Sequence, residues 1–338
     1  MRKSLLSILA IAVMITANGQ AKFHLIKKTI LGGDGGWDYL SVDTKNKRLY
    51  ISHGTQVEVL NSQTHEREGT IPGLQGVHGV ISIPETGRGV TTNGRTNTAT
   101  IFDLKTLKAI TELPTGKNPD ALLYDRFSKH VFIFNHSDVT ATVLDIENAK
   151  VVGTVDLGGT ALEAGATDEK GTIFVNLEEA GEIVSFDAKT LAIKNRWKLS
   201  CEEPTGLAID TKNSRLFSVC HSGVMLVIDA TSGEVLSQLP IGQRVDGVVF
   251  DPEIKMAFSS NGEGTITVVE EVSANEFKVL ETIETARGAR TIALDATSHH
   301  VFVTTAMLGE APSPTTDNPH PRPAVLPNTF MVLEYGMK

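Results

Sequence analysis

The stretch KNPDALLYDRFSKHVFIFN, residues 117–135, holds one unit of the pattern that decides the fold. Two runs rich in apolar, β-branched and aromatic residues, ALLYD and HVFIF, flank the polar turn RFSK, and this arrangement predicts two antiparallel strands. Downstream, ATVLD and KVVGTVDLG add a third and a fourth strand. Asp120 stands at the head of the first strand and Asn135 ends the second, so each marks a fixed place in the unit.

The same unit recurs seven times, at spacings of 40 to 44 residues. A first series occupies the place of Asp120: Asp38, His78, Asp120, Glu163, Thr205, Asp246 and Arg290. A second series occupies the place of Asn135: His53, Asn93, Asn135, Asn176, Cys220, Asn261 and Thr305. A third series follows the third strand of each unit: Asn61, Asp103, Asp145, Asp187, Asp229, Glu270 and Glu334. Chance similarity would not keep three series in register. The seven-fold repeat therefore predicts an all-β fold, a seven-bladed β-propeller with four antiparallel strands per blade.

The chain divides into two parts. Residues 1–21 combine two cations, an apolar run and small residues, which is typical of a secretory signal peptide. Residues 22–338 are expected to form a single β-propeller domain, with a Pro-rich insertion at 306–328 in the seventh blade. That insertion should be irregular, either a lid or partner contact or a passive loop. Because the seventh unit lacks an outer strand, we expect the N-terminal strand, residues 23–32, to complete the last blade and close the ring.

The leader-like segment also bears on location. After it, no apolar run approaches 18 residues, so we expect no membrane span in the mature chain. The protein is expected to be exported, periplasmic or extracellular, and monomeric. Export permits a disulfide between the two cysteines, Cys201 and Cys220, which are expected on one face. Two alternatives stay open: Cys220 with His221 binds copper or zinc, or Cys220 is a small buried apolar residue.

Composition and motifs exclude several classes of function. The formal net charge is −9 and no basic run offsets it, so nucleic acid is an unlikely partner. No C-x-x-C-H is present, which excludes covalent haem c. The chain has no nucleotide motif: the phosphate-loop pattern is absent, and the glycines of ILGGDGGWD do not follow the dinucleotide spacing.

The repeats NPDALLYDRFSKHVFIFN and ATVLDIENAKVVGTVDLGG resemble those of the YncE-like, YVTN-repeat β-propellers, over essentially the whole mature chain. This resemblance implies a seven-bladed, exported propeller. The matching motifs are structural, and the YVTN tetrapeptide of the family occurs only in altered forms such as FIFN at 132–135. The resemblance therefore concerns the fold more than the function.

In a propeller, the first two series should form two concentric rings around the mouth of the central channel. We expect ligand-binding residues there, namely Asp38, His78, Asp120, Glu163, Asp246, Arg290, His53, His136, His221 and Trp37. A divalent metal such as Zn, Cu, Ni or Mn is one candidate, with His53, His78 and Asp38 as ligands. The alternative is an ordinary solvated rim, in which Trp37 is a packed aromatic residue.

These observations lead to two hypotheses. The first is an exported, non-enzymatic β-propeller that binds a small ligand, a cation or a protein partner at the channel mouth. The alternative is a metal-assisted hydrolase, lactonase or lyase acting at the same face, with a histidine such as His78 or His221 as acid or base.

Overall fold

The computed structural model describes residues 23–159, 161–313 and 323–337. The expected signal peptide, residues 1–21, and part of the Pro-rich insertion lie outside these ranges. Within them the chain contains strands and no helix, and the strands form seven sheets of four antiparallel strands each. A helix long and apolar enough to span a bilayer is therefore absent from this part of the chain.

The strands follow the seven predicted units. Blade 1 comprises β2 (Trp37–Asp43), β3 (Arg48–His53), β4 (Gln56–Asn61) and β5 (Arg67–Pro72). Blade 2 comprises β6 (Val77–Ile83), β7 (Arg88–Asn93), β8 (Thr98–Asp103) and β9 (Ala109–Pro114). Blade 3 comprises β10 (Pro119–Asp125), β11 (His130–Asn135), β12 (Thr140–Asp145) and β13 (Lys150–Asp156). Blade 4 comprises β14 (Leu162–Thr167), β15 (Thr172–Leu177), β16 (Glu182–Asp187) and β17 (Ile193–Lys198). Blade 5 comprises β18 (Pro204–Asp210), β19 (Arg215–Cys220), β20 (Val224–Asp229) and β21 (Val235–Pro240). Blade 6 comprises β22 (Val245–Asp251), β23 (Met256–Asn261), β24 (Thr265–Ser273) and β25 (Glu276–Glu284). Blade 7 comprises β26 (Ile292–Asp295), β27 (His300–Thr305), β28 (Met331–Met337) and β1 (Phe23–Ile30).

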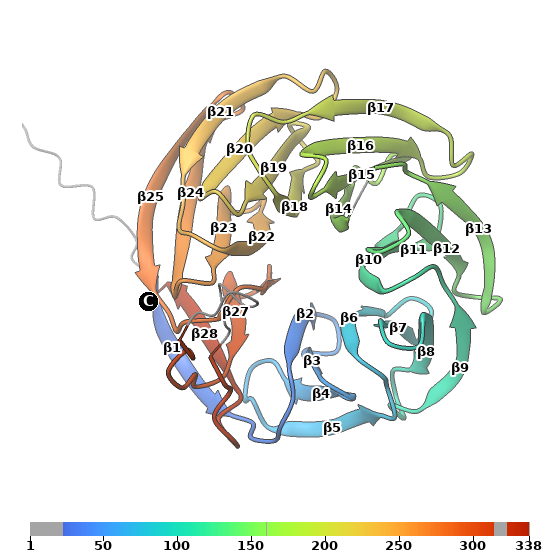
Figure 1. Cartoon of the computed structure of the whole chain (residues 1–338), viewed down its shortest axis with the longest axis vertical. Helices are drawn as coiled ribbons and strands as arrows, with labels where there is room; N and C mark the ends of the chain where they lie inside the picture. The colour runs from blue at the N-terminus through green and yellow to red at the C-terminus, as the bar shows by residue number, and fades with distance from the viewer. Residues whose placement is uncertain (1–22, 160, 314–322, 338) are drawn as a thin grey trace, which may run out of the picture.

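The blades stand around one axis, with the first strand of each blade innermost and the fourth at the rim (Figure 1). The N-terminal strand β1 pairs antiparallel with β28, from Phe23 opposite Met337 to Ile30 opposite Met331. This confirms that the two ends of the chain close the ring in blade 7. The Pro-rich insertion connects β27 to β28, and a short bridge between Leu308 and Val325 ties its two described ends together.

Large apolar side chains fill the space between neighbouring blades. The third residue of the second strand is aromatic in six blades and is almost fully buried there: Tyr50, Phe132, Phe174, Phe217, Phe258 and Phe302. Blade 2 has Val90 at that position. Phe102 of β8 packs on the other face of blade 2, against Tyr50 of blade 1, and its ring lies where a Cβ on Gly89 would be. Each blade thus presents a similar apolar face, and the sequence repeat produces a similar packing contact at each interface between blades.

The polar third series closes hairpin turns and, in one place, joins blades. Asp103, Asp187 and Asp229 each accept backbone N–H bonds from residues two and three positions further on. These bonds are typical of turns that an aspartate side chain stabilises. Glu334 has a different role, because it lies between His65 Nε2 at 3.1 Å and His300 Nδ1 at 2.7 Å. Burial alone would raise the pKa of Glu334, but the hydrogen bonds from the two histidines lower it.

Candidate functional site

A bulge in the first strand of the blades directs the first series toward the channel. In six blades the pairing of the first strand with the second shifts register at the first-series position, for example between Trp37 and Leu40 and between Pro119 and Leu122. In blade 7, pairing begins at Ile292, just after Arg290. A bulge leaves a residue out of the ladder and turns its side chain. The sequence predicts the positions of this series, and the bulge explains why they face the axis.

The backbone groups that the bulges release are bonded by the preceding blade. The Thr291 hydroxyl donates to the Asp38 carbonyl at 2.7 Å, and the Thr92 hydroxyl donates to the Asp120 carbonyl at 2.6 Å. Thr205 does the same for Val245 at 3.0 Å. Thr205 is therefore a buried link between blades and not a channel-facing residue. These bonds fix the first strands of blades 1, 3 and 6 relative to the preceding blade, and so they position the channel-facing side chains of those strands.

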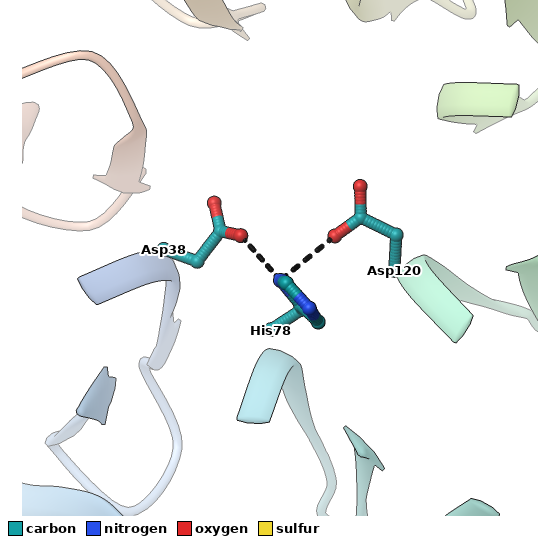
Figure 2. Close-up of side chains that lie close together, drawn as sticks. All are labelled: Asp38, His78 and Asp120. Carbon is teal, nitrogen blue, oxygen red and sulfur yellow. Dashed lines mark hydrogen bonds and ion pairs between the residues drawn. The ribbon is translucent and has the colours of Figure 1, made fainter. Parts of the chain in front are cut away.

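Six first-series side chains form what we call the mouth ring: Asp38, His78, Asp120, Glu163, Asp246 and Arg290. Arg290 bonds Asp246 and also lies 3.4 Å from Asp38 Oδ1. His78 Nδ1 lies 2.7 Å from Asp38 Oδ2 and 3.4 Å from Asp120 Oδ1. Figure 2 shows Asp38, His78 and Asp120 converging from the first strands of three consecutive blades. The chain of contacts thus runs without a gap from blade 6 through blades 7, 1 and 2 to blade 3.

Histidines next to the second series extend this network. His136 Nδ1 lies 3.2 Å from Glu163 Oε1, and one donor atom each of Asp120, His136 and Glu163 lie within 4.8 Å of one another. His221 Nδ1 lies 3.2 Å from Glu203 and 3.6 Å from Glu178. The structure therefore brings these two predicted site residues to carboxylates of the same face, and it adds Glu178 and Glu203, which the sequence patterns did not single out.

Burial and mutual repulsion perturb the acids of the ring. The pKa of Asp120 is raised to about 7, first by burial and then by the charge of Asp38. Burial likewise raises the pKa of Glu163 well above its ordinary value, and it raises that of Asp246 although Arg290 opposes the change. The hydrogen bond to Glu163 raises the pKa of His136 to about 9, so this imidazole is cationic at neutral pH.

Tyr39, which follows Asp38, is a member of the site that sequence reasoning missed. Its side chain extends from blade 1 to pack against the apolar cluster of blades 3 and 4, on the opposite side of the channel. Burial raises the pKa of its hydroxyl well above 10, and the charges of Asp120 and Glu163 raise it further. The sequence did mark Tyr39 as exceptional, because in the other six blades a small residue follows the first-series position: Gly79, Ala121, Ala164, Gly206, Gly247 and Thr291.

Beyond Tyr39 the channel changes character. The later residues of the first strands line a cavity of about 500 Å³, and its walls are mainly apolar, with Leu123, Ile209 and Val249 among them. All first strands run in the same direction around the ring, so the charged side chains gather at one end and the apolar ones at the other.

The second series does not form an outer ring at the mouth, which corrects the expectation from the sequence. All of its members are buried. Asn135 donates its amide to the hydroxyls of Thr140 and Thr142 at 2.9 Å, and Asn93 and Asn261 bond two hydroxyls of the third strand in the same way. In blades 2, 3 and 6 these asparagines hold the second strand to the third.

His53 and Trp37 also have packing roles. The His53 ring stacks on Phe330 at 4.2 Å, and its Nδ1 lies 3.4 Å from Glu58. Among the described residues, the clusters of possible metal donors include His78 and Asp38 but not His53, so the structure does not gather the predicted trio. Trp37 stacks on Phe330 and donates to the Gly288 carbonyl at 3.3 Å.

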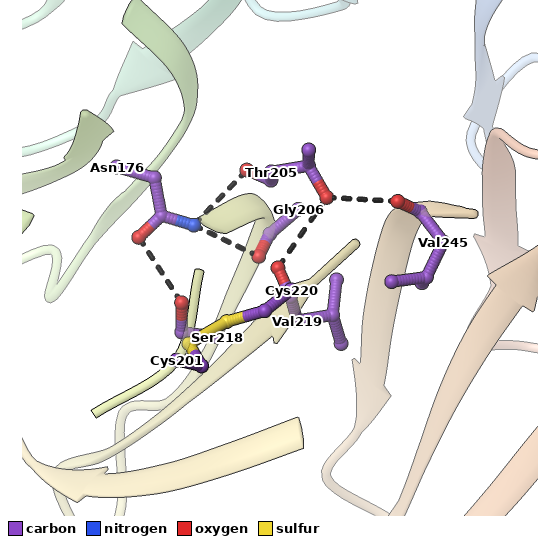
Figure 3. Close-up of a disulfide and its surroundings, with 8 residues drawn as sticks. All are labelled: Asn176, Cys201, Thr205, Gly206, Ser218, Val219, Cys220 and Val245. Atoms are coloured by element: carbon purple, nitrogen blue, oxygen red, sulfur yellow. Dashed lines mark hydrogen bonds between the residues drawn. A yellow bond between two sulfur atoms is a disulfide. The ribbon is translucent and has the colours of Figure 1, made fainter. Parts of the chain in front are cut away.

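Cys201 and Cys220 form a disulfide in the structure, with Cα atoms 6.2 Å apart (Figure 3). The bond ties the loop before β18 to the end of β19. It thereby holds Glu203 beside His221, whose backbone N–H donates to the Glu203 carbonyl at 3.0 Å. Asn176, drawn in the same figure, bonds the carbonyls of Thr205 and Gly206 and links blade 4 to blade 5.

Fold and site together define the chain as a seven-bladed β-propeller with one charged channel mouth. A chain of Kuenenia stuttgartiensis hydrazine synthase superposes with a TM-score of 0.70 at 13% identity, covering 81% of this chain and 94% of that one. A chain from the crystal structure of the mitotic checkpoint complex superposes with a TM-score of 0.75 at 11% identity, covering 100% of this chain and 99% of that one. At such identities the likeness concerns the fold alone. No protein-family model and no curated protein sequence matches the chain.

Proposed function

We propose that this protein is a non-enzymatic propeller of the YncE-like repeat type that binds a positively charged ligand in the mouth ring. One observation carries the proposal. Four buried carboxylates, those of Asp38, Asp120, Glu163 and Asp246, face one channel, and Arg290 is the only permanent cation among the six ring side chains.

The cost of this arrangement argues against a purely structural role. Donor atoms of Asp38 and Asp120 lie within 4.8 Å of each other. At that separation two full charges repel by about 3 kcal/mol at an effective dielectric near 20, but by less than about 1 kcal/mol in bulk water. Both residues are only 9% exposed, so the larger figure is the relevant one, and His78 between them, whose pKa the two carboxylates raise, offsets part of it when protonated. A bound cation would remove this repulsion, whereas a solvated rim would not have it.

The proposal is tested by thermal shift with small cationic probes at pH 8, namely Zn²⁺, Mn²⁺, Ca²⁺ and spermidine. A probe present at a hundred times its Kd should raise the Tm by about 4 °C for a chain of this length. The double variant Asp120→Asn/Asp246→Asn should lose the shift. Its matched control, Glu85→Gln/Glu169→Gln, removes two exposed carboxylates at the other end of the first strands and should keep it. The proposal fails if no probe shifts the parent protein or if both double variants respond alike.

A second candidate is a metal-assisted hydrolase, lactonase or lyase at the same mouth. The observation that favours it is the His136–Glu163 pair beside Asp120, since an imidazole with a pKa of about 9 is a proton donor at neutral pH. Turnover of a lactone or ester panel by metal-supplemented protein, lost in His136→Gln, would support this candidate over simple binding.

We also propose that the protein is exported to the periplasm or the cell exterior. The disulfide supports this location, because structural disulfides persist in oxidising compartments. Intact mass of the protein from its native host should show cleavage near Gly19 or Ala21. An uncleaved chain with free thiols in the cytoplasm would contradict the proposal.

A further inference from the structure

We propose that the cation of the mouth ring is a divalent first-row transition metal ion, bound by Asp38 Oδ2, His78 Nδ1 and Asp120 Oδ1. This inference rests on the proposed function and gives it a specific ligand. The three donors come from β2, β6 and β10, the first strands of three consecutive blades, and lie within 4.8 Å of one another.

An unsatisfied oxygen points to a ligand at this place. Asp120 is only 9% exposed, and its Oδ1 is buried without a hydrogen bond. His78 Nδ1 lies 3.4 Å from this oxygen, but that nitrogen carries at most one hydrogen and lies closer to Asp38 Oδ2, at 2.7 Å. Leaving a buried carboxylate oxygen without a partner costs about 1–3 kcal/mol or more. A cation between the three atoms would satisfy Asp120 and Asp38 together.

The nitrogen favours a metal ion over an organic cation. An imidazole gives a lone pair to a metal, whereas an ammonium group at the same point would compete with His78 for the two carboxylates. One nitrogen and two carboxylate oxygens suit Zn²⁺, Co²⁺ or Mn²⁺, and they offer no thiolate that would select Cu⁺. With ion–donor distances of about 2.0 Å, a tetrahedral site needs donors about 3.3 Å apart. The observed 2.7 and 3.4 Å lie on either side of that value.

Neighbouring groups orient the donors. Arg290 lies 3.4 Å from Asp38 Oδ1, which leaves Oδ2 directed at His78. Gly94 makes room for the imidazole, because a Cβ there would lie 2.6 Å from His78 Nε2. Supports of this kind, outside the ligands themselves, are common around metal sites and contribute to affinity. Three protein donors also leave a fourth coordination position, which is available to water or to a second ligand.

The test is a titration of the chelator-treated, gel-filtered full-length mature protein with Co²⁺, followed by absorption and by calorimetry, with Zn²⁺ as competitor. We expect one equivalent of Co²⁺ to bind, with the d–d spectrum of a nitrogen and oxygen site, and Zn²⁺ to displace it. Asp120→Asn and His78→Gln should each weaken binding at least 100-fold. Melting curves of both variants establish that they are folded.

The matched control is His221→Gln, which alters a histidine of the same rim that also lies between two carboxylates, Glu178 and Glu203. It should bind Co²⁺ like the parent. Binding that survives His78→Gln, or that is lost in His221→Gln instead, overturns the assignment. If Co²⁺ does not bind but spermidine still shifts the Tm in a manner that depends on Asp120 and Asp246, the metal inference fails and the proposed function stands. If neither probe binds, both fail.

Discussion

Asp120→Asn is expected to stabilise the metal-free protein at neutral and alkaline pH, although the residue is buried. The pKa of Asp120 is raised from 3.8 to about 7 by burial and by the charge of Asp38. A group with a raised folded-state pKa contributes stability below its unfolded pKa and loses it as the pH rises through the folded value. At about 1.4 kcal/mol per pH unit, Asp120 costs the folded state about 4 kcal/mol above pH 7. Asparagine has nearly the same shape and removes that cost.

The assay is thermal and urea unfolding with a chelator present, between pH 4 and 8.5. Parent and variant should melt together near pH 4, and the variant should melt about 6 °C higher at pH 8. Asp125→Asn, at the other end of β10, is the matched control. Asp125 accepts bonds from Ser128 N–H and the Thr167 hydroxyl, so its replacement should destabilise the protein by about 1 kcal/mol. Equal or lower stability of Asp120→Asn at pH 8 would refute the argument that the ring is under electrostatic strain.

Three further perturbations test other parts of the structure. Glu334→Gln should lower the free energy of unfolding by about 1–3 kcal/mol at pH 7. Because the pKa of Glu334 is lowered in the folded protein, the difference should be full at neutral pH and should be lost as the pH falls through that lowered pKa, as melts at acid pH would show. Replacing Cys201 and Cys220 by serine opens a loop with a sequence separation of 19 and should cost about 3 kcal/mol in urea unfolding, with no effect of added reductant on the variant. Tyr39→Ala should cost about 2 kcal/mol through lost packing across the channel, whereas Tyr39→Phe should melt like the parent; the reverse order would mean that the hydroxyl and not the ring matters.

The sequence predicts the blades because each of them solves the same packing problem. An aromatic or branched residue such as Phe132 enters the interfaces between blades, and in four of the seven blades an aspartate such as Asp103 ends the third strand. These positions vary little, so the repeat period is visible in the sequence. Closure by residues 23–32 could be inferred for the same reason, since a missing outer strand leaves an unpaired edge.

The site was harder to predict because direction depends on backbone detail. A period of 42 residues places Asp120 and Asn135 equally well, but only the bulge in β10 turns Asp120 to the channel while Asn135 stays in the blade ladder. The contact partners of the histidines also depend on backbone direction. His53 lies in the same blade as Asp38 but stacks on Phe330. The histidine that contacts Asp38 is His78, from the next blade.

The pairing of β1 with β28 joins two strands that lie about 300 residues apart in the sequence. Because β1 pairs only with β28 in blade 7, it has no partner strand until Met331–Met337 have been synthesised. A nascent chain that lacks β28 therefore carries an unpaired strand, which can pair with another chain. Truncation of either terminus by one strand should for this reason yield aggregates and not a slightly smaller ring.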